Sequence, residues 1–177
     1  MAGEHHDDPK VARIESQGEI HPEAWSRTLE EMELIAEDRR EDGWEVTTVM
    51  TPHTDGVSKD MGDHDRFGLM HIIPNNYIDD FLDAYDEEAY TEYLFYVNEL
   101  ESFLYGVIEL IDPANERAIL IAFRYDLVLA GGMVQSAMEE GCLYSHIKRI
   151  DGEILASIPY EEYDALVRVP PELSDRP

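Results

Sequence analysis

The fold class rests on one stretch of sequence, FLYGVIELIDPANERAILIAFR at residues 103–124. Its two halves, 103–111 and 117–124, are rich in β-branched and aromatic side chains, which favour strands. Between them lies the segment DPAN at 112–115, whose residue types are typical of a tight turn. The stretch therefore predicts an antiparallel hairpin. A similar run at 90–97 extends this hairpin to a β-meander at the centre of the fold.

The same signals predict further strands and helices on both sides of the meander. Strands are expected at 44–50, 67–73, 142–150 and 153–158, and the Asp151-Gly152 turn joins the last two. Helices are expected at about 22–42, 75–85, 125–140 and 160–166. Because strands joined by tight turns pair antiparallel, the chain is predicted to be α+β, with a largely antiparallel sheet of about six to seven strands and three to four helices packed on it.

Composition and length indicate one domain with polar ends. The length of 177 residues is typical of a single domain. We expect a flexible acidic tail at 1–20, a globular domain at 21–168 and a polar tail at 169–177. Within the domain, residues 51–65 lack apolar periodicity and predict a long mobile loop.

The net charge of the chain indicates the salt concentration in which the protein works. There are 40 acidic residues against 13 basic ones, a formal net charge of -27, and the acids run through the whole sequence. Such self-repulsion is tolerable in concentrated salt, where the Debye length falls from about 10 Å at 0.1 M to about 3 Å at 1 M. We therefore expect a halophilic protein in contact with high-salt solvent and cations. A mesophilic acidic protein with a disordered tail is the alternative.

Charge, hydropathy and cysteine content also limit the partners and the compartment. A strongly acidic chain without a basic cluster argues against nucleic acid as a partner. No apolar run approaches the length that spans a bilayer, so no membrane partner is expected. The polar N-terminal residues lack the apolar core of a signal peptide, and the one cysteine, Cys142, fits a reducing compartment. These features predict a cytoplasmic protein.

Four segments of the chain resemble a known family. They are WSRTLEEM at 25–32, GWEV at 43–46, DRFGLMH at 65–71 and YSHIK at 144–148. They are similar to segments of an uncharacterised family of haloarchaeal cytoplasmic proteins of unknown function, over about residues 22 to 158. The resemblance implies a halophilic archaeal source. It implies no reaction, cofactor or catalytic residue.

Candidate metal ligands gather in the expected loop. His53, Asp55, Asp63 and His64 combine imidazole and carboxylate groups, which suit a divalent transition metal. Their spacing matches no established ligand motif, and a solvated loop is the alternative interpretation. No cofactor is predicted beyond this possible divalent metal.

A second group of polar residues lies within expected strands and suggests a ligand pocket on the sheet. The group consists of His71, Glu109, Tyr144 and His146. If 67–73 and 142–150 are neighbouring strands, the two histidines would line a polar pocket suited to proton transfer near neutral pH. The alternatives are hydrogen-bonded core histidines, and a Glu109 that faces water from an edge strand.

The sequence contains no established catalytic motif, so three functions stay open. The first is a non-enzymatic domain that acts through protein association, as a homodimer. Its interface would use aromatic residues of the meander, which are Tyr93, Phe95, Tyr96, Phe103 and Tyr105. The second is a small-molecule-binding or sensory domain with a pocket on the sheet. The third is a metal-dependent hydrolase.

Overall fold

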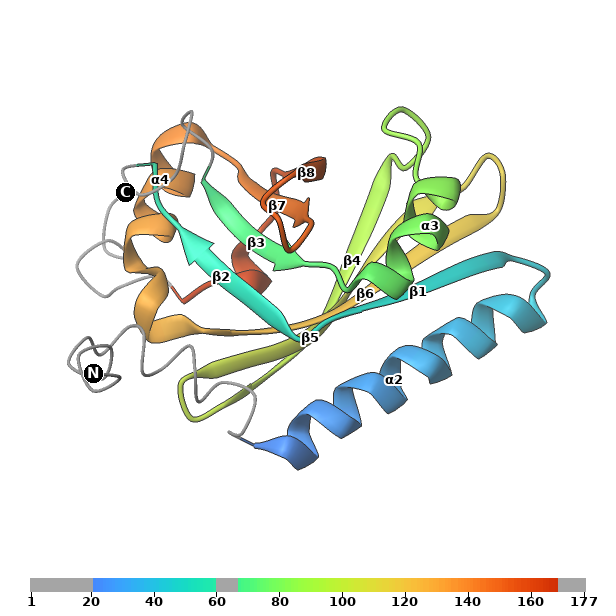
Figure 1. Ribbon diagram of the computed structural model, residues 1–177, viewed down its shortest axis with the longest axis horizontal. Coiled ribbons are helices and arrows are strands. Elements are labelled where there is room, and N and C mark those ends of the chain that lie inside the picture. The colour runs from blue at the N-terminus through green and yellow to red at the C-terminus, as the bar shows by residue number, and fades with distance from the viewer. Residues whose placement is uncertain (1–20, 60–66, 169–177) are drawn as a thin grey trace.

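The computed structural model describes residues 21–59 and 67–168, and the predicted tails at 1–20 and 169–177 lie outside the described residues. Within the described residues the chain forms α-helices, 3-10 helices and strands. The α-helices are α2 (Pro22–Glu41), α3 (Asn75–Ala84) and α4 (Gly131–Glu140), and the 3-10 helices are η3 (Leu127–Ala130) and η4 (Asp164–Leu166). The strands are β1 (Glu45–Thr51), β2 (His53–Val57), β3 (Gly68–Ile72), β4 (Glu92–Leu100), β5 (Phe103–Asp112), β6 (Arg117–Asp126), β7 (Leu143–Lys148) and β8 (Ile154–Tyr160). Figure 1 shows their arrangement.

The strands form two mixed sheets of four, so the α+β class is confirmed but the single sheet is wrong. Sheet A has the order β1-β6-β5-β4 and sheet B the order β2-β3-β7-β8. The predicted hairpins are confirmed: β4 with β5, β5 with β6, and β7 with β8 pair antiparallel. The pairs β1 with β6 and β3 with β7 are parallel. These pairs join strands far apart in the sequence, where no local turn signal exists.

The passage from sheet A to sheet B takes place at Pro52. This residue has no backbone N–H to donate to a ladder, and it separates β1 in sheet A from β2 in sheet B. β2 then pairs antiparallel with β3, from His53 opposite Ile72 to Val57 opposite Gly68. The prediction of a loop throughout 51–65 is therefore wrong for residue 51, which ends β1, and for residues 53–57. Residues 58 and 59 lie in no strand or helix, and 60–65 lie outside the described residues.

Two further segments differ from the prediction because strand pairing overrides local helix preference. β6 continues through Tyr125 and Asp126, which pair with the start of β5, so the expected helix at 125–140 begins only after η3. Gly131 opens α4 instead of weakening the middle of a longer helix. Likewise Tyr160 is the last residue of β8 and pairs with Leu143, so the helix expected at 160–166 shrinks to η4.

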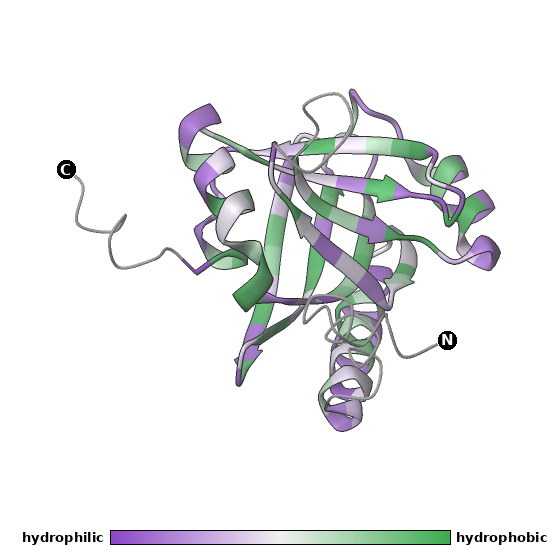
Figure 2. Cartoon of the chain, turned by 60° about the vertical axis from the view of Figure 1, so that its left-hand side comes forward, coloured by the Kyte–Doolittle hydropathy of each residue, from purple (hydrophilic) through white to green (hydrophobic). Residues whose placement is uncertain are grey.

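Helix α2 covers one face of sheet A over β1, β5 and β6. The helix begins with a proline in its first turn, and Gly43, at a φ of 88°, follows its C-terminal end. Met32 and Ala36 of α2 pack with Val107, Leu120 and Ala122 of the sheet. The outer side of the helix is polar, and Figure 2 shows hydrophilic and hydrophobic bands along it. In the described residues no helix is long and apolar enough to cross a membrane.

The other face of sheet A packs against sheet B, and this layer is the main core. Sheet A contributes Ile108, Ile119 and Ile121, and sheet B contributes Leu69 and Ile147. Both β5 and β6 are almost entirely buried because α2 covers one face and sheet B the other. Helix α3 lies against β1 (Figure 1). The edge strands of sheet A are thus β1, beside α3, and β4 on the far side.

Candidate functional site

The two strand histidines lie on neighbouring strands but on opposite faces of sheet B. β3 and β7 pair in parallel, with His71 opposite Ile147 and Met70 opposite His146. Side chains alternate between faces along a strand, so His71 shares its face with Ser145 and not with His146. Tyr144 lies on the His146 face, where the two rings stack with centroids 5.6 Å apart. Because of this parity the two histidines do not line one pocket.

Each of these histidines is held inside the protein by two hydrogen bonds. His71 is fully buried, and its Nδ1 lies 3.0 Å from Thr54 Oγ1 while its Nε2 lies 2.9 Å from Ser145 Oγ. His146 makes contacts of 2.8 Å with Ser157 Oγ and the Phe67 carbonyl oxygen. Burial, together with the nearby His146, lowers the pKa of His71 to about 3. Its imidazole is therefore neutral near pH 7.

Glu109, the third residue of the predicted pocket, lies in sheet A and not at an edge. β5 runs between β6 and β4, and the Glu109 side chain is fully buried under α2. Arg39 donates to its carboxylate from Nε at 3.0 Å and from Nη2 at 3.3 Å, and Tyr96 donates at 3.0 Å. These bonds raise the pKa of Arg39, while burial and the carboxylate raise the pKa of Tyr96 to about 12. The cluster is a satisfied buried ion pair between α2 and the sheet.

The candidate metal ligands are only partly described. His53 and Asp55 lie on the same face of β2, where His53 is exposed and Asp55 is partly buried. Asp63 and His64 lie outside the described residues. Among residues 21–59 and 67–168, no three His, Cys, Asp or Glu side chains are grouped so as to hold a metal ion.

Most of the meander aromatics predicted for an interface serve the core. Phe103 and Tyr105 are buried, and Tyr105 Oη lies 3.1 Å from His21 Nδ1 on the α2 side of the sheet. The rings of Tyr93 and Phe95 lie 4.9 and 5.0 Å from the ring of Tyr160 at the other face. Tyr96 alone among the five is exposed, at 36%.

A pocket that sequence reasoning missed lies at the β1 edge of sheet A. Its volume is about 450 Å³. The last turn of α2, the start of β1, the C-terminal half of α3 and the start of β6 meet there. The residues that line it are Arg40, Glu45, Val46, Thr47, Thr48, Asp80, Asp83, Ala84, Tyr90, Arg117 and Ala118. We call this the β1-edge pocket.

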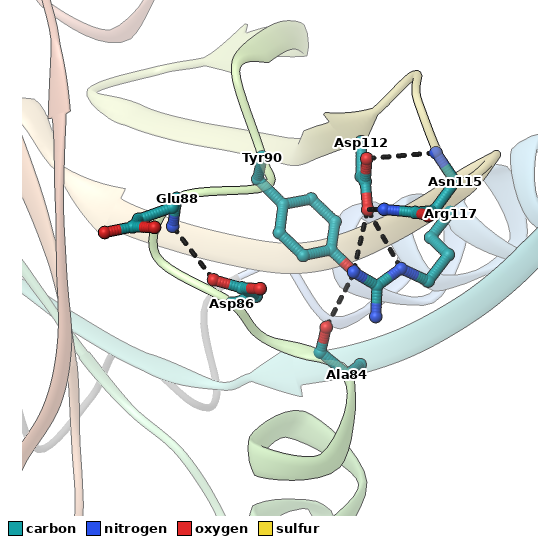
Figure 3. Close-up of polar contacts among 7 residues, drawn as sticks. All are labelled: Ala84, Asp86, Glu88, Tyr90, Asp112, Asn115 and Arg117. Atoms are coloured by element: carbon teal, nitrogen blue, oxygen red, sulfur yellow. Dashed lines mark hydrogen bonds and ion pairs between the residues drawn. The ribbon is translucent and has the colours of Figure 1, made fainter.

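Arg117 is fixed at this pocket by a buried carboxylate. Asp112, at the end of β5, accepts from Arg117 Nε at 2.9 Å and Nη2 at 2.7 Å, and from Asn115 at 2.9 and 3.2 Å. The bonds from Asn115, and then those from Arg117, hold the pKa of Asp112 below its usual range. Figure 3 shows the Arg117 guanidinium beside the Tyr90 ring, with the Asp112 carboxylate above it. The Tyr90 hydroxyl donates to the Ala84 carbonyl oxygen at 2.8 Å, which ties the end of α3 to this site.

The sequence carried a partial signal for this site. The turn between β5 and β6 was recognisable, and with it the pairing that places Asp112 opposite Arg117. No sequence signal predicted that α2 and α3 contribute residues to the pocket, because this depends on how the two helices dock beside β1. No spacing along the chain relates Arg40 to Asp80.

The fold and site define a small α+β domain with a polar pocket at a sheet edge. A family of unknown function, DUF7529, matches residues 11–168, so the chain belongs to this family. The comparison with curated proteins found no match, and neither did the comparison with solved structures.

Proposed function

We propose that this chain is a non-enzymatic, salt-adapted cytoplasmic domain that acts by self-association through one face of β4. The observation that carries the proposal is an exposed apolar strip on this edge strand, formed by Leu94, Tyr96 and Leu100. Their exposed fractions are 47%, 36% and 43%. We call these three residues the β4 strip.

The β4 strip lies on the face of sheet A that α2 covers only in part. Leu94, Tyr96 and Leu100 are opposite Glu109, Val107 and Phe103 of β5, and alternation places the three on one face. Helix α2 packs against β1, β5 and β6. The β4 end of this face therefore stays open beside the helix, with exposed Asn98 between Tyr96 and Leu100, and exposed apolar side chains grouped in this way mark interaction sites.

The opposite face of β4 is already covered by the chain itself. Tyr93 and Phe95 pack on Tyr160, and the Tyr93 hydroxyl accepts from the Glu162 backbone N–H at 3.0 Å. Arg168 forms an ion pair with Glu99 near the end of the strand. A second copy is thus expected on the β4 strip and not on the face that carries Tyr93.

A second copy suits this surface because it supplies the same apolar strip. Two-fold association places one β4 strip against the other, and apolar burial contributes about 25 cal/mol per Å² before the costs of association. Each copy carries a formal charge of -27, so the repulsion between copies must be screened. We therefore expect the dimer to form in concentrated salt.

Light scattering coupled to size exclusion in about 2 M KCl tests the proposal. The unchanged protein should be dimeric, and Leu94→Ser with Leu100→Ser should make it monomeric while its circular dichroism is retained. Leu34→Ser is the matched control, because Leu34 is 62% exposed on α2 and lies outside the strip. A protein that is monomeric at every accessible concentration, or a dimer that survives the double change, would overturn the proposal.

A further inference from the structure

We infer that Ser157 is a nucleophile that becomes covalently acylated by an activated acyl compound, an ester or thioester with a good leaving group. The inference rests on the pair that Ser157 forms with His146, in which the serine is exposed and the imidazole is fixed. It does not depend on self-association, because β8 lies in sheet B and the β4 strip in sheet A. It concerns a stoichiometric modification of the chain and not a catalytic cycle.

The pairing of β7 with β8 brings the two side chains together. His146 is directly opposite Ser157, so both side chains lie on the same face of sheet B. The neighbouring residues Ile147 and Ile158 belong to the main core, so His146 and Ser157 lie on the face turned away from sheet A. Ser157 is exposed, whereas His146 is only 3% exposed. A reactant in solvent can therefore reach the hydroxyl, while the imidazole is largely shielded.

The Phe67 carbonyl sets the tautomer of His146. A carbonyl oxygen can only accept, so the imidazole donates its Nε2–H to this oxygen across 2.8 Å. Nδ1 then carries a lone pair, and it lies 2.8 Å from Ser157 Oγ. The Ser157 hydroxyl therefore donates to Nδ1. A hydroxyl that donates to an oriented imidazole is the arrangement that activates a serine, with the imidazole as general base.

Aromatic packing holds the imidazole in place and favours its charged form. The Tyr144 ring stacks on His146 with centroids 5.6 Å apart and 18° between the planes. Phe67 in turn packs edge-on against Tyr144 at 5.5 Å. When Nδ1 takes the serine proton, the imidazolium lies on the face of an aromatic ring and keeps its bond to the Phe67 carbonyl. Both contacts stabilise a cation.

The backbone N–H of Ser157 points to the open edge of β8. The Lys148 carbonyl oxygen accepts from the Ile73 N–H at 2.9 Å, so the backbone groups of Lys148 point toward β3, and by alternation those of His146 do too. His146 and Ser157 are therefore a non-hydrogen-bonded pair, in which the Ser157 N–H points away from β7. Pro159 fits this pattern, because a strand proline requires that its nitrogen face outward. Since β8 ends sheet B, no described strand of the sheet pairs on this side.

These groups supply what acyl transfer to Ser157 requires. Ser157 Oγ forms a bond to the acyl carbon while its proton passes to His146 Nδ1, and the acyl oxygen gains the negative charge. The Ser157 N–H is a donor available to that oxygen. The bond between the acyl carbon and the leaving group then breaks, and the leaving group takes the proton from Nδ1. The products are an ester of Ser157 and a free alcohol or thiol.

Acetylation of the full chain by 4-nitrophenyl acetate tests the inference. The reaction is run near neutral pH, in KCl at which circular dichroism shows the native fold. Release of 4-nitrophenolate gives the rate, and peptide mass mapping locates the acetyl groups. Ser26 is the internal reference, because it is likewise exposed but lies on α2. We expect Ser157 to be acetylated about 100-fold or more faster than Ser26.

Variants then assign the roles of the two side chains. Ser157→Ala should abolish the fast release of 4-nitrophenolate, and Ser26→Ala should leave it unchanged. His146→Gln should slow the acetylation of Ser157 about 100-fold, because glutamine can donate to the Phe67 carbonyl but cannot take up the proton. Tyr144→Phe keeps the stacked ring and is the control for a change beside the imidazole, so it should react at the unchanged rate.

Three results would rule the inference out. They are an unmodified Ser157, a Ser157 that reacts no faster than Ser26, and a folded His146→Gln variant that reacts at the unchanged rate. Circular dichroism shows whether His146→Gln is folded. If it is not, the ratio of the two serine rates in the unchanged protein decides the question, since Ser26 has the same hydroxyl on an exposed surface.

Discussion

His71 shows how burial fixes the charge state of one side chain. Thr54 and Ser145 occupy its two ring nitrogens, and the ring lies edge-on to Phe123 with centroids 5.6 Å apart. A neutral imidazole offers one donor and one acceptor, and a hydroxyl can serve either, so both contacts are satisfied without a proton being added. Protonation would place a charge among apolar groups with no carboxylate bonded to the ring. For this reason the pKa of His71 falls to about 3.

This depressed pKa predicts a loss of stability in mild acid. The unfolded chain protonates His71 near pH 6.5, whereas the folded protein does so only near pH 3, so the unfolded state binds more protons between these values. Stability is therefore highest above pH 6.5 and falls as the pH drops toward 3. At pH 5 the free energy of unfolding should be lower by about 2 kcal/mol from this residue.

Urea unfolding at pH 7.5 and pH 5 in constant KCl measures the effect, with His71→Gln as the comparison. The carboxylates titrate in both proteins, so the difference between their pH dependences isolates the histidine. The variant should lose less stability than the unchanged protein on going to pH 5. Equal losses in the two proteins would show that His71 does not carry the pH dependence.

The pairing of β3 with β7 depends on a close approach of their backbones at the start of β3. Gly68 has a φ of 128°, and a Cβ built on it would lie 2.2 Å from the Tyr144 carbonyl oxygen. Neither strand can yield easily, because β7 pairs with β3 on one side and with β8 on the other. Gly68→Ala should therefore destabilise the protein by more than about 2 kcal/mol.

A second glycine variant allows the cost of backbone strain to be distinguished from the cost of a steric clash. Gly43 has a φ of 88° but would meet nothing within 4 Å of an added Cβ. Gly43→Ala should cost only about 1 kcal/mol, the strain of a left-handed alanine. Urea unfolding of both variants gives the comparison. Similar losses at the two positions would mean that the contact with Tyr144 is relieved by a small shift of the strands.

The sequence predicted the elements that local signals specify and missed those that depend on distant partners. The turns at 112–115 and at Asp151-Gly152 identified two hairpins that the structure confirms. The parallel pairs, β1 with β6 and β3 with β7, have no turn to reveal them, so the division into two sheets was missed. The same limit applies to the sites, because strand parity separates His71 from His146 and helix docking assembles the β1-edge pocket.

At the scale of the whole molecule, carboxylates outnumber cations so strongly that ion pairs cannot balance them. The best-satisfied carboxylates, Glu109 and Asp112, are buried and paired with Arg39 and Arg117. Buried pairs of this kind are screened little by salt. Most of the 40 acidic residues have no cation to pair with, since the chain holds only 13. Their mutual repulsion favours the unfolded state, in which the charges lie farther apart.

The last prediction is that KCl raises the melting temperature, most steeply at low concentration. Screening shortens the Debye length from about 10 Å at 0.1 M to about 3 Å at 1 M, so repulsion between exposed carboxylates fades over this range. Beyond it only weaker effects of salt on hydration remain. Melting followed by circular dichroism across the KCl series should therefore show a steep rise that flattens above about 1 M. Sucrose, which stabilises proteins without screening charge, is the control and should give no such break. A melting temperature that is constant or falls with KCl would contradict salt adaptation. It would also remove the reason for expecting two chains of charge -27 to associate only in concentrated salt.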